Sequence, residues 1–143
     1  DRSPGEIRAP ANDHPAGPMM VLVDSSVWID HLRRREPDLE RLLEAGRVST
    51  HPAVMGELAC GSLRNRDRFL GDLRRLPSLP ECRPEEALHL VETHRLWGRG
   101  LGWVDVLLLT SCRLAGARLW TKDRPLSTAA GALSVEYPAQ AER

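Results

Sequence analysis

Strands that alternate with helices along this chain predict an α/β protein, with a central, mainly parallel sheet flanked by helices in three layers. The apolar run at residues 20–23 has no polar interruption, which suits a parallel strand covered on both faces. Further short apolar segments at residues 48 and 117–121 are separated from it by helical patterns. A length of 143 residues is enough for one domain with a normal core.

The elements of the first half are bounded by residues with known preferences. Ser25 or Ser26 can cap the first helix, Pro37 opens the next helix at its first turn, and Gly46 ends it. We therefore expect, in order, a strand at Met20–Asp24, a helix carrying Val27 to Leu32, a helix from Pro37 to Gly46, a short strand at Val48 and a helix from Pro52 to Leu63.

Proline and glycine also divide the second half of the chain. Pro77 and Pro80 break an arginine-rich helix, residues 98–102 form a glycine-rich loop, and Gly116 stops a very apolar helix. The expected elements are helices at Asn65–Leu76, Pro84 to about Trp97 and Trp103–Ala115, a strand at Ala117–Thr121, a short helix at Pro125–Ala130 and a last strand at Leu133–Val135.

The ends of the chain are expected to lie outside this fold, which we assign to residues 20–137. Residues 1–19 are rich in proline and have no apolar core of a signal peptide, so we interpret them as a disordered leader or as sequence upstream of a start at Met19 or Met20. Residues 138–143 are assigned to a tail.

Composition restricts the cellular setting and the kind of partner. No apolar run reaches the roughly 20 residues of a membrane span, so we expect no membrane association. Cys60, Cys82 and Cys112 show no CxxC spacing and are typical of reduced thiols in a cytoplasmic protein. With 20 basic and 20 acidic residues, a non-specific cationic coat for nucleic acid is disfavoured.

Two aspartates follow strands of the predicted sheet. Asp24 ends the first strand and Asp123 comes just after the strand at residues 117–121. Ligands of parallel sheets bind outside the carboxyl ends of the strands, so both side chains should face the same edge. Taken alone, Asp24 is equally well explained as a helix cap.

Two further carboxylates interrupt apolar helix patterns. Glu57 has only small or apolar neighbours three and four positions away, and Gly56 beside it suggests a close backbone approach. Asp105 shares a face with Leu108 and Leu109 and borders the core. Ordinary explanations are an arginine partner for Glu57 and the helix dipole for Asp105.

Together, the four acids indicate a cation site. Unpaired buried carboxylates are unfavourable by several kcal/mol, and carboxylates that lie close together resist ionisation. A hard divalent cation such as Mg²⁺ or Mn²⁺ removes both difficulties, because it prefers oxygen ligands.

Four segments carry a resemblance to a known family: DSSVWI at residues 24–29, HPAVMGELA at 51–59, GWVD at 102–105 and LWTKD at 119–123. In this order the chain resembles the PIN-domain ribonucleases over residues 20–136, and within them the VapC toxins of type II toxin–antitoxin systems. Each segment alone is weak, whereas all four in register with the expected elements are fairly specific.

The resemblance implies that Asp24, Glu57, Asp105 and Asp123 bind Mg²⁺ or Mn²⁺. It also implies that Ser26 hydrogen-bonds a carboxylate or a metal-bound water, and that Thr121 matches the small polar residue before the last acid. The residues after Asp123 depart from the family, where an aromatic residue is common.

The implied activity is metal-dependent hydrolysis of RNA phosphodiester bonds by an endoribonuclease. A VapB-type antitoxin, which lies across the active-site groove in family members, and a second copy of the chain in a homodimer are the implied partners. Single-stranded or loop RNA is the expected substrate, since its bases are accessible.

Other readings stay open from the sequence alone. A PIN-like module that only binds a protein would keep the fold without metal. A receiver domain is disfavoured because Ser25, and not a second acid, follows Asp24. Trp28, Trp97, Trp103 and Trp120 are more typical of a core than of base stacking, although Trp103, next to the glycine-rich loop, is the one to test against RNA.

Overall fold

The computed structural model describes residues 18–138, and most of the expected leader and tail lies outside the described residues. Along the described chain the elements are β1 (Val21–Val23), α1 (Ser25–Arg33), α2 (Pro37–Glu44), β2 (Val48–Ser49), α3 (Pro52–Ala59), α4 (Arg66–Arg74), α5 (Pro84–His94), α6 (Trp103–Ala115), β3 (Arg118–Trp120) and α7 (Arg124–Ala132).

The sheet is parallel and has the order β2-β1-β3. Val21 pairs with Val48 on one side and with Arg118 on the other, and Val23 pairs with Trp120. All three residues of β1 are fully buried, as an uninterrupted apolar strand predicts. The central position of β1 puts its carboxyl end, and the residue after it, in the middle of the molecule.

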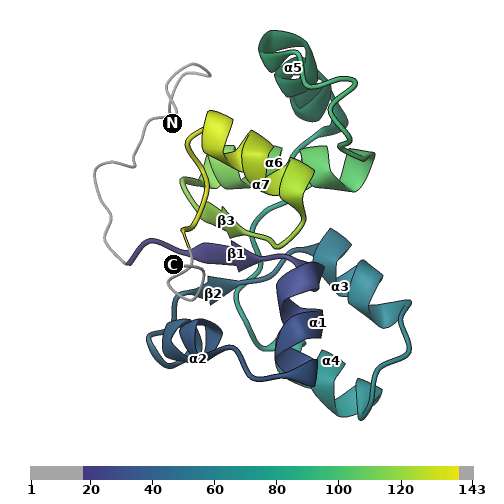
Figure 1. Ribbon diagram of the computed structural model, residues 1–143, viewed down its shortest axis with the longest axis vertical. Helices are drawn as coiled ribbons and strands as arrows, with labels where there is room; N and C mark the ends of the chain where they lie inside the picture. The colour runs from purple at the N-terminus through teal and green to yellow at the C-terminus, as the bar shows by residue number, and fades with distance from the viewer. Residues whose placement is uncertain (1–17, 139–143) are drawn as a thin grey trace, which may run out of the picture.

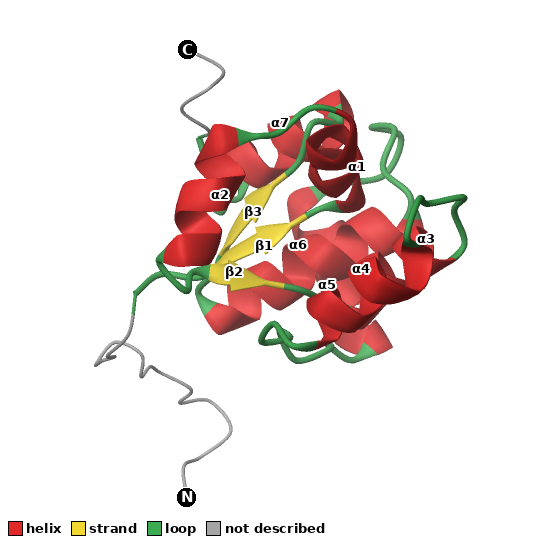
Figure 2. Ribbon diagram, turned by 90° about the horizontal axis from the view of Figure 1, so that it is seen from below, coloured by secondary structure: helices red, strands yellow, loops and turns green. Residues whose placement is uncertain are grey.

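Helices cover both faces of the sheet, which gives the three-layer α/β fold that the sequence predicts. Figure 2 shows α2 and α7 on one face and α6 on the other. Figure 1 shows α1 to α4 gathered toward the β2 edge and α5 to α7 toward the β3 edge. The carboxyl ends of β1 and β3 therefore lie at the boundary between the two groups of helices.

Two predicted helix ends and one predicted strand are wrong, each for a local reason. Helix α3 ends at Ala59 and not at Leu63, because the guanidinium of Arg66 binds the carbonyl of Ala59 with N–O distances of 3.2 and 2.9 Å and closes that end. Helix α5 ends at His94, since Arg95 adopts a left-handed conformation with φ of 53°.

The predicted last strand is the third correction. Residues 133–135 form no strand, because α7 continues to Ala132 and Ser134 has a positive φ of 62°. An isolated parallel bridge between Leu119 and Glu136, and a hydrogen bond of 3.0 Å from the guanidinium of Arg118 to the carbonyl of Ser134, join this segment to β3.

The core and the thiols agree only in part with the sequence analysis. Leu22, Leu119 and Trp120 are buried around the sheet, and Cys112 is a buried thiol of α6. Cys60, expected within an apolar pattern, is exposed at the end of α3. Within the described chain, no helix has the length and apolar character needed to cross a lipid bilayer.

Candidate active site

Asp24 is a buried acid whose side chain does not cap α1. It has only 6% of its surface exposed, and the first helical N–H groups bind its backbone carbonyl instead of its carboxylate. Its Oδ2 accepts hydrogen bonds from the hydroxyls of Ser26 at 2.8 Å and Thr121 at 2.7 Å. The alternative that Asp24 is a side-chain cap is therefore wrong, and the carboxylate is held by two donors from different strand ends.

The two hydroxyls join the ends of β1 and β3. Ser26 and Thr121 lie 3.3 Å apart, oxygen to oxygen. The backbone N–H of Lys122 donates to Ser26 Oγ at 2.9 Å, and that of Asp123 donates to Thr121 Oγ1 at 3.1 Å. These bonds fix the loop that carries Asp123 against the loop that carries Asp24, two segments almost a hundred residues apart in the chain.

Glu57 reaches the same place from α3. Ser25 Oγ donates to Glu57 Oε1 at 3.0 Å, which ties α3 to the start of α1. Partial burial raises the pKa of Glu57. The bond from Ser25 opposes this rise, and the charges of Asp24 and Asp105 add to it.

The expected surroundings of Glu57 need correction. Its side chain is exposed and not on a buried face, and a Cβ at Gly56 would meet no atom within 4 Å, so there is no close backbone approach. Among the described residues Glu57 has no ion pair, so an arginine partner does not explain it.

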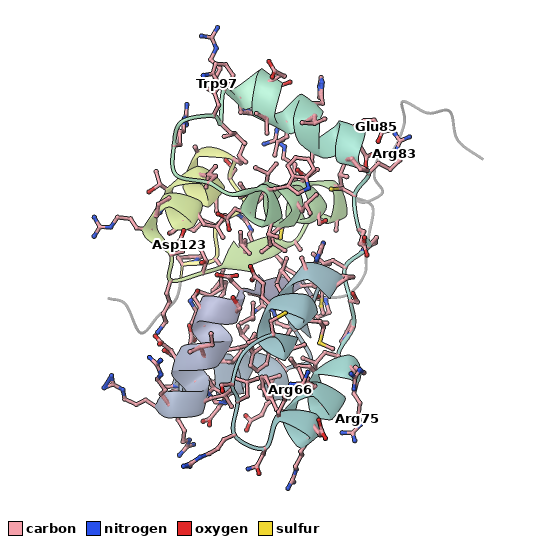
Figure 3. The ribbon with its side chains drawn as sticks, turned by 90° about the vertical axis from the view of Figure 1, so that its right-hand side faces the viewer. Arg66, Arg75, Arg83, Glu85, Trp97 and Asp123 are labelled. Atoms are coloured by element: carbon pink, nitrogen blue, oxygen red, sulfur yellow. The ribbon has the colours of Figure 1, made fainter. Side chains whose placement is uncertain are left out.

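Asp105 and Asp123 each bind a backbone N–H at the start of a helix. Asp105 accepts from Gly102 N at 2.9 Å at the beginning of α6, and Asp123 accepts from Leu126 N at 3.1 Å at the beginning of α7. Asp123 lies exposed on the side of the molecule seen in Figure 3. Helix geometry thus gives both aspartates a structural role in addition to their place beside Asp24.

Electrostatic repulsion links Asp105 to its acidic neighbours. Burial raises the pKa of Asp105. The bond from Gly102 opposes this rise, and the charges of Asp123 and Asp24 strengthen it. The charge of Asp24 thus raises the pKa of both Asp105 and Glu57. None of the four forms an ion pair within the described chain.

The donor set fits a hard cation held partly by water. All donors are carboxylate or hydroxyl oxygens, which suit Mg²⁺ or Mn²⁺. In residues 18–138, no three His, Cys, Asp or Glu side chains lie close enough to coordinate an ion by themselves. Mg²⁺ commonly keeps several waters and takes only one or two carboxylates together with substrate phosphates, so this spacing is compatible with it.

The sequence predicts neither the contact of Ser25 with Glu57 nor the ion pairs that Lys122 makes next to the site. Ser25 was expected only as a possible helix cap, and the doublet of serines after Asp24 was the available signal. Lys122 is the single lysine of the chain, and its ammonium binds Glu36 and, at 3.1 Å, Asp30. Burial lowers the pKa of Lys122, but the bonds to Glu36 and Asp30 outweigh burial and raise it.

We expect replacement of Lys122 by Met to lower the free energy of unfolding by about 1–3 kcal/mol, because it leaves the carboxylate of Glu36 buried without its cation. Glu36 is only 9% exposed. Urea denaturation at neutral pH measures the change. The matched control is Arg35→Met, which breaks the exposed pair with Glu40 and should change stability little. Equal unfolding midpoints for the Lys122 variant and the unchanged chain would contradict the role of this pair.

Comparison with known proteins agrees with the sequence motifs. The sequence model of the PIN domain matches residues 21–132. The chain is 50% identical over 111 residues to Ribonuclease VapC32 from two strains of Mycobacterium tuberculosis, CDC 1551 / Oshkosh and ATCC 25618 / H37Rv, an alignment that covers 77% of this chain and 90% of each relative.

A solved structure supports the fold. The crystal structure of PAE2754 from Pyrobaculum aerophilum superposes with a TM-score of 0.54 at 16% identity, over 82% of this chain and 91% of that one. At such low identity the likeness concerns the fold alone. From the match over most of the chain and the high identity to its mycobacterial relatives, this chain belongs to the PIN domain family and, within it, to the VapC proteins.

Proposed function

We propose that this protein is a metal-dependent endoribonuclease and the toxin of a type II toxin–antitoxin pair, acting on RNA in the cytoplasm. The observation that carries the proposal is that Asp24, buried directly after β1, is held by the hydroxyls of Ser26 and Thr121 and has no cationic partner among the described residues, while its charge acts on Glu57 and Asp105. The 50% identity to a protein named a ribonuclease supports RNA as the substrate.

In this proposal Asp24, Glu57, Asp105 and Asp123 hold Mg²⁺ or Mn²⁺. When bound, such an ion lowers the pKa of a coordinated water and neutralises charge that develops on the phosphodiester. Ser26 and Thr121 hold Asp24 in one orientation through the hydroxyl bonds at 2.8 and 2.7 Å, so that little reorganisation is needed during the reaction.

The reaction needs no nucleophilic side chain. Water attacks phosphorus, a new P–O bond forms on one side, and the P–O bond to the leaving oxygen breaks on the other. One of the carboxylates accepts the proton that the attacking water releases. The leaving oxygen takes a proton from solvent.

The partners are part of the same proposal. A VapB-type antitoxin is expected to cover this acidic surface and to block access of RNA, and two copies of the chain are expected to form a homodimer. Both expectations come from family membership.

The proposal predicts cleavage of RNA that depends on a divalent cation. With Mg²⁺ or Mn²⁺ the purified protein should cut a structured RNA with single-stranded loops, and chelation by EDTA should stop cutting because the four carboxylates then repel the phosphates. Gel analysis of end-labelled RNA measures both. Adding back excess Mg²⁺ is the control for the chelator. If RNA stays intact under every cation tested, or is cut equally in EDTA, a protein-binding module without catalysis becomes the better description.

A further inference from the structure

Exposed aromatic and basic side chains lie in the segment that joins α5 to α6 and at the start of α7. Two of the four tryptophans, Trp28 and Trp120, are buried, as expected for core residues. Trp97 and Trp103 are not, with 59% and 46% of their surfaces exposed. Large exposed indoles are unusual on a protein surface, and both stand at the ends of the same loop, residues 98–102.

The loop between the tryptophans is anchored at the active site. A Cβ at Gly100 would lie 3.5 Å from side-chain atoms of Pro125, in the first turn of α7, which Asp123 caps. Figure 3 shows the chain after Trp97 running from the end of α5 along the side of the molecule that carries Asp123. Trp103 begins α6, two residues before Asp105. The loop therefore packs on the helix that Asp123 caps, and Trp103 stands in the same first helical turn as Asp105.

Positive charge accompanies the two indoles. Arg95 and Arg99 flank Trp97, and Arg124 follows Asp123. All three are exposed, and within residues 18–138 none of their guanidinium groups has an ion-pair or hydrogen-bonding partner. Unpaired guanidinium groups attract phosphate, whereas the adjacent carboxylates repel it unless a cation is bound.

We propose that Trp97 and Trp103, with Arg95, Arg99 and Arg124, form a binding surface for single-stranded RNA that stacks bases next to the cleaved bond. Aromatic faces accept any base, and guanidinium groups follow the phosphates, which is the combination that single-stranded RNA requires. In a duplex the bases are stacked on one another, so they offer no free face on which an indole can stack. The inference rests on the proposed ribonuclease function and extends it to how RNA is selected.

Trp103 is the residue with the largest expected effect, because it is nearest in the chain to an acid of the site. Trp103→Ala should weaken binding of a short single-stranded oligoribonucleotide about tenfold, and Trp103→Phe should restore most of it, since a phenyl ring still stacks. Fluorescence anisotropy of the labelled oligoribonucleotide in Mg²⁺ measures affinity in an Asp24→Asn background, which keeps the RNA intact. The matched control is Leu88→Ala, which removes an exposed apolar side chain of α5, outside the proposed surface.

Oligoribonucleotides in which one nucleotide has no base test stacking directly. Removing the base that contacts Trp103 should weaken binding to the chain with Trp103 and have little further effect on Trp103→Ala, because the same contact is already lost. Arg99→Gln should weaken binding and reduce its dependence on salt, while Arg68→Gln on α4 should not.

Several results would overturn this inference. Unchanged affinity in Trp97→Ala and Trp103→Ala would remove the surface from RNA binding while leaving the proposed nuclease intact, provided that the unsubstituted chain still cuts RNA. Loss of a dimer in these variants, seen by sedimentation with unchanged RNA affinity, would assign the surface to a second copy. If the unsubstituted chain cuts no RNA at all, the proposed function fails first and this inference fails with it.

Discussion

Replacing Asp24 by Asn is expected to reduce RNA cleavage by more than about 100-fold, because substitution of partners that merely orient a metal ligand already reduces activity 10- to 100-fold. Asn keeps the size of the side chain and one oxygen acceptor for the hydroxyls of Ser26 and Thr121. It removes the charge at the most buried of the four acids. The initial rate of cleavage of a fluorogenic oligoribonucleotide measures the effect.

The control for Asp24→Asn is the same substitution at an aspartate that lies outside the site. Asp67 on α4 has a side chain that is 98% exposed and, among the described residues, pairs only with Arg66 at 3.3 Å. Asp67→Asn should cleave RNA at the unchanged rate and unfold at a temperature close to that of the original chain, and Asp24→Asn should still unfold cooperatively, which shows that it is folded. Similar cleavage rates for the Asp24 and Asp67 variants would show that the catalytic centre lies elsewhere.

The parts of the fold that the sequence predicts well are those with a strong local signal. Helix α6 has the expected bounds, Trp103 to Ala115, because a long apolar pattern ends in a glycine with positive φ. Strand β1 was recognised by its continuous apolar run. The last strand fails for the opposite reason, since apolar residues near 133–135 pack against β3 through one bridge without forming a ladder.

The site shows the same division between local and distant information. Asp24 and Asp123 were placed at strand ends from topology alone, and the structure puts both there. The small and apolar helical neighbours of Glu57 predict that it lies on an apolar face, but small neighbours do not imply a covered face. The α3 surface around it is open, and its carboxylate is influenced by residues of other elements.

Distant partners account for what the sequence analysis missed. Ser25 meets Glu57 across 32 positions, and Lys122 meets Glu36 across 86 positions. Predictions from periodicity and helix caps use residues that are close together in the sequence. They therefore cannot predict contacts between side chains that are this far apart. A lysine that occurs once in a chain, directly before a candidate ligand, was the only indication available.

Asp105→Asn is expected to have opposite effects on stability without and with a divalent cation. In EDTA at neutral pH it should raise the unfolding temperature, because the carboxylate of Asp105 is partly buried and repelled by Asp123 and Asp24. The amide oxygen of Asn can still accept the bond from Gly102. Saturating Mg²⁺ or Mn²⁺ should stabilise the original chain, by about 2.7 kcal/mol at a free concentration one hundred times the Kd. The variant should lose most of this gain.

The sign of the pH dependence follows from the raised pKa. In the interval between the ordinary pKa of an aspartate and the raised pKa of folded Asp105, the folded chain binds more protons than the unfolded chain, so stability falls as pH rises. Above the raised pKa the full destabilisation is present. Differential scanning fluorimetry in EDTA should therefore show the variant and the original chain alike in acid and separated at neutral pH.

Glu57→Gln tests whether the stabilisation expected for Asp105→Asn comes from repulsion among the acids or from the position of Asp105 in α6 alone. Partial burial also raises the pKa of Glu57. The bond from Ser25 opposes this rise, and the charges of Asp24 and Asp105 add to it. In EDTA, Glu57→Gln should therefore stabilise the protein over a similar pH interval. If repulsion among the acids is the cause, the double variant should gain less stability than the sum of the gains from Asp105→Asn and Glu57→Gln. Each single substitution already removes the repulsion between these two carboxylates. Strict additivity would mean that the two carboxylates do not sense each other, and a shared cation would then lack its electrostatic basis.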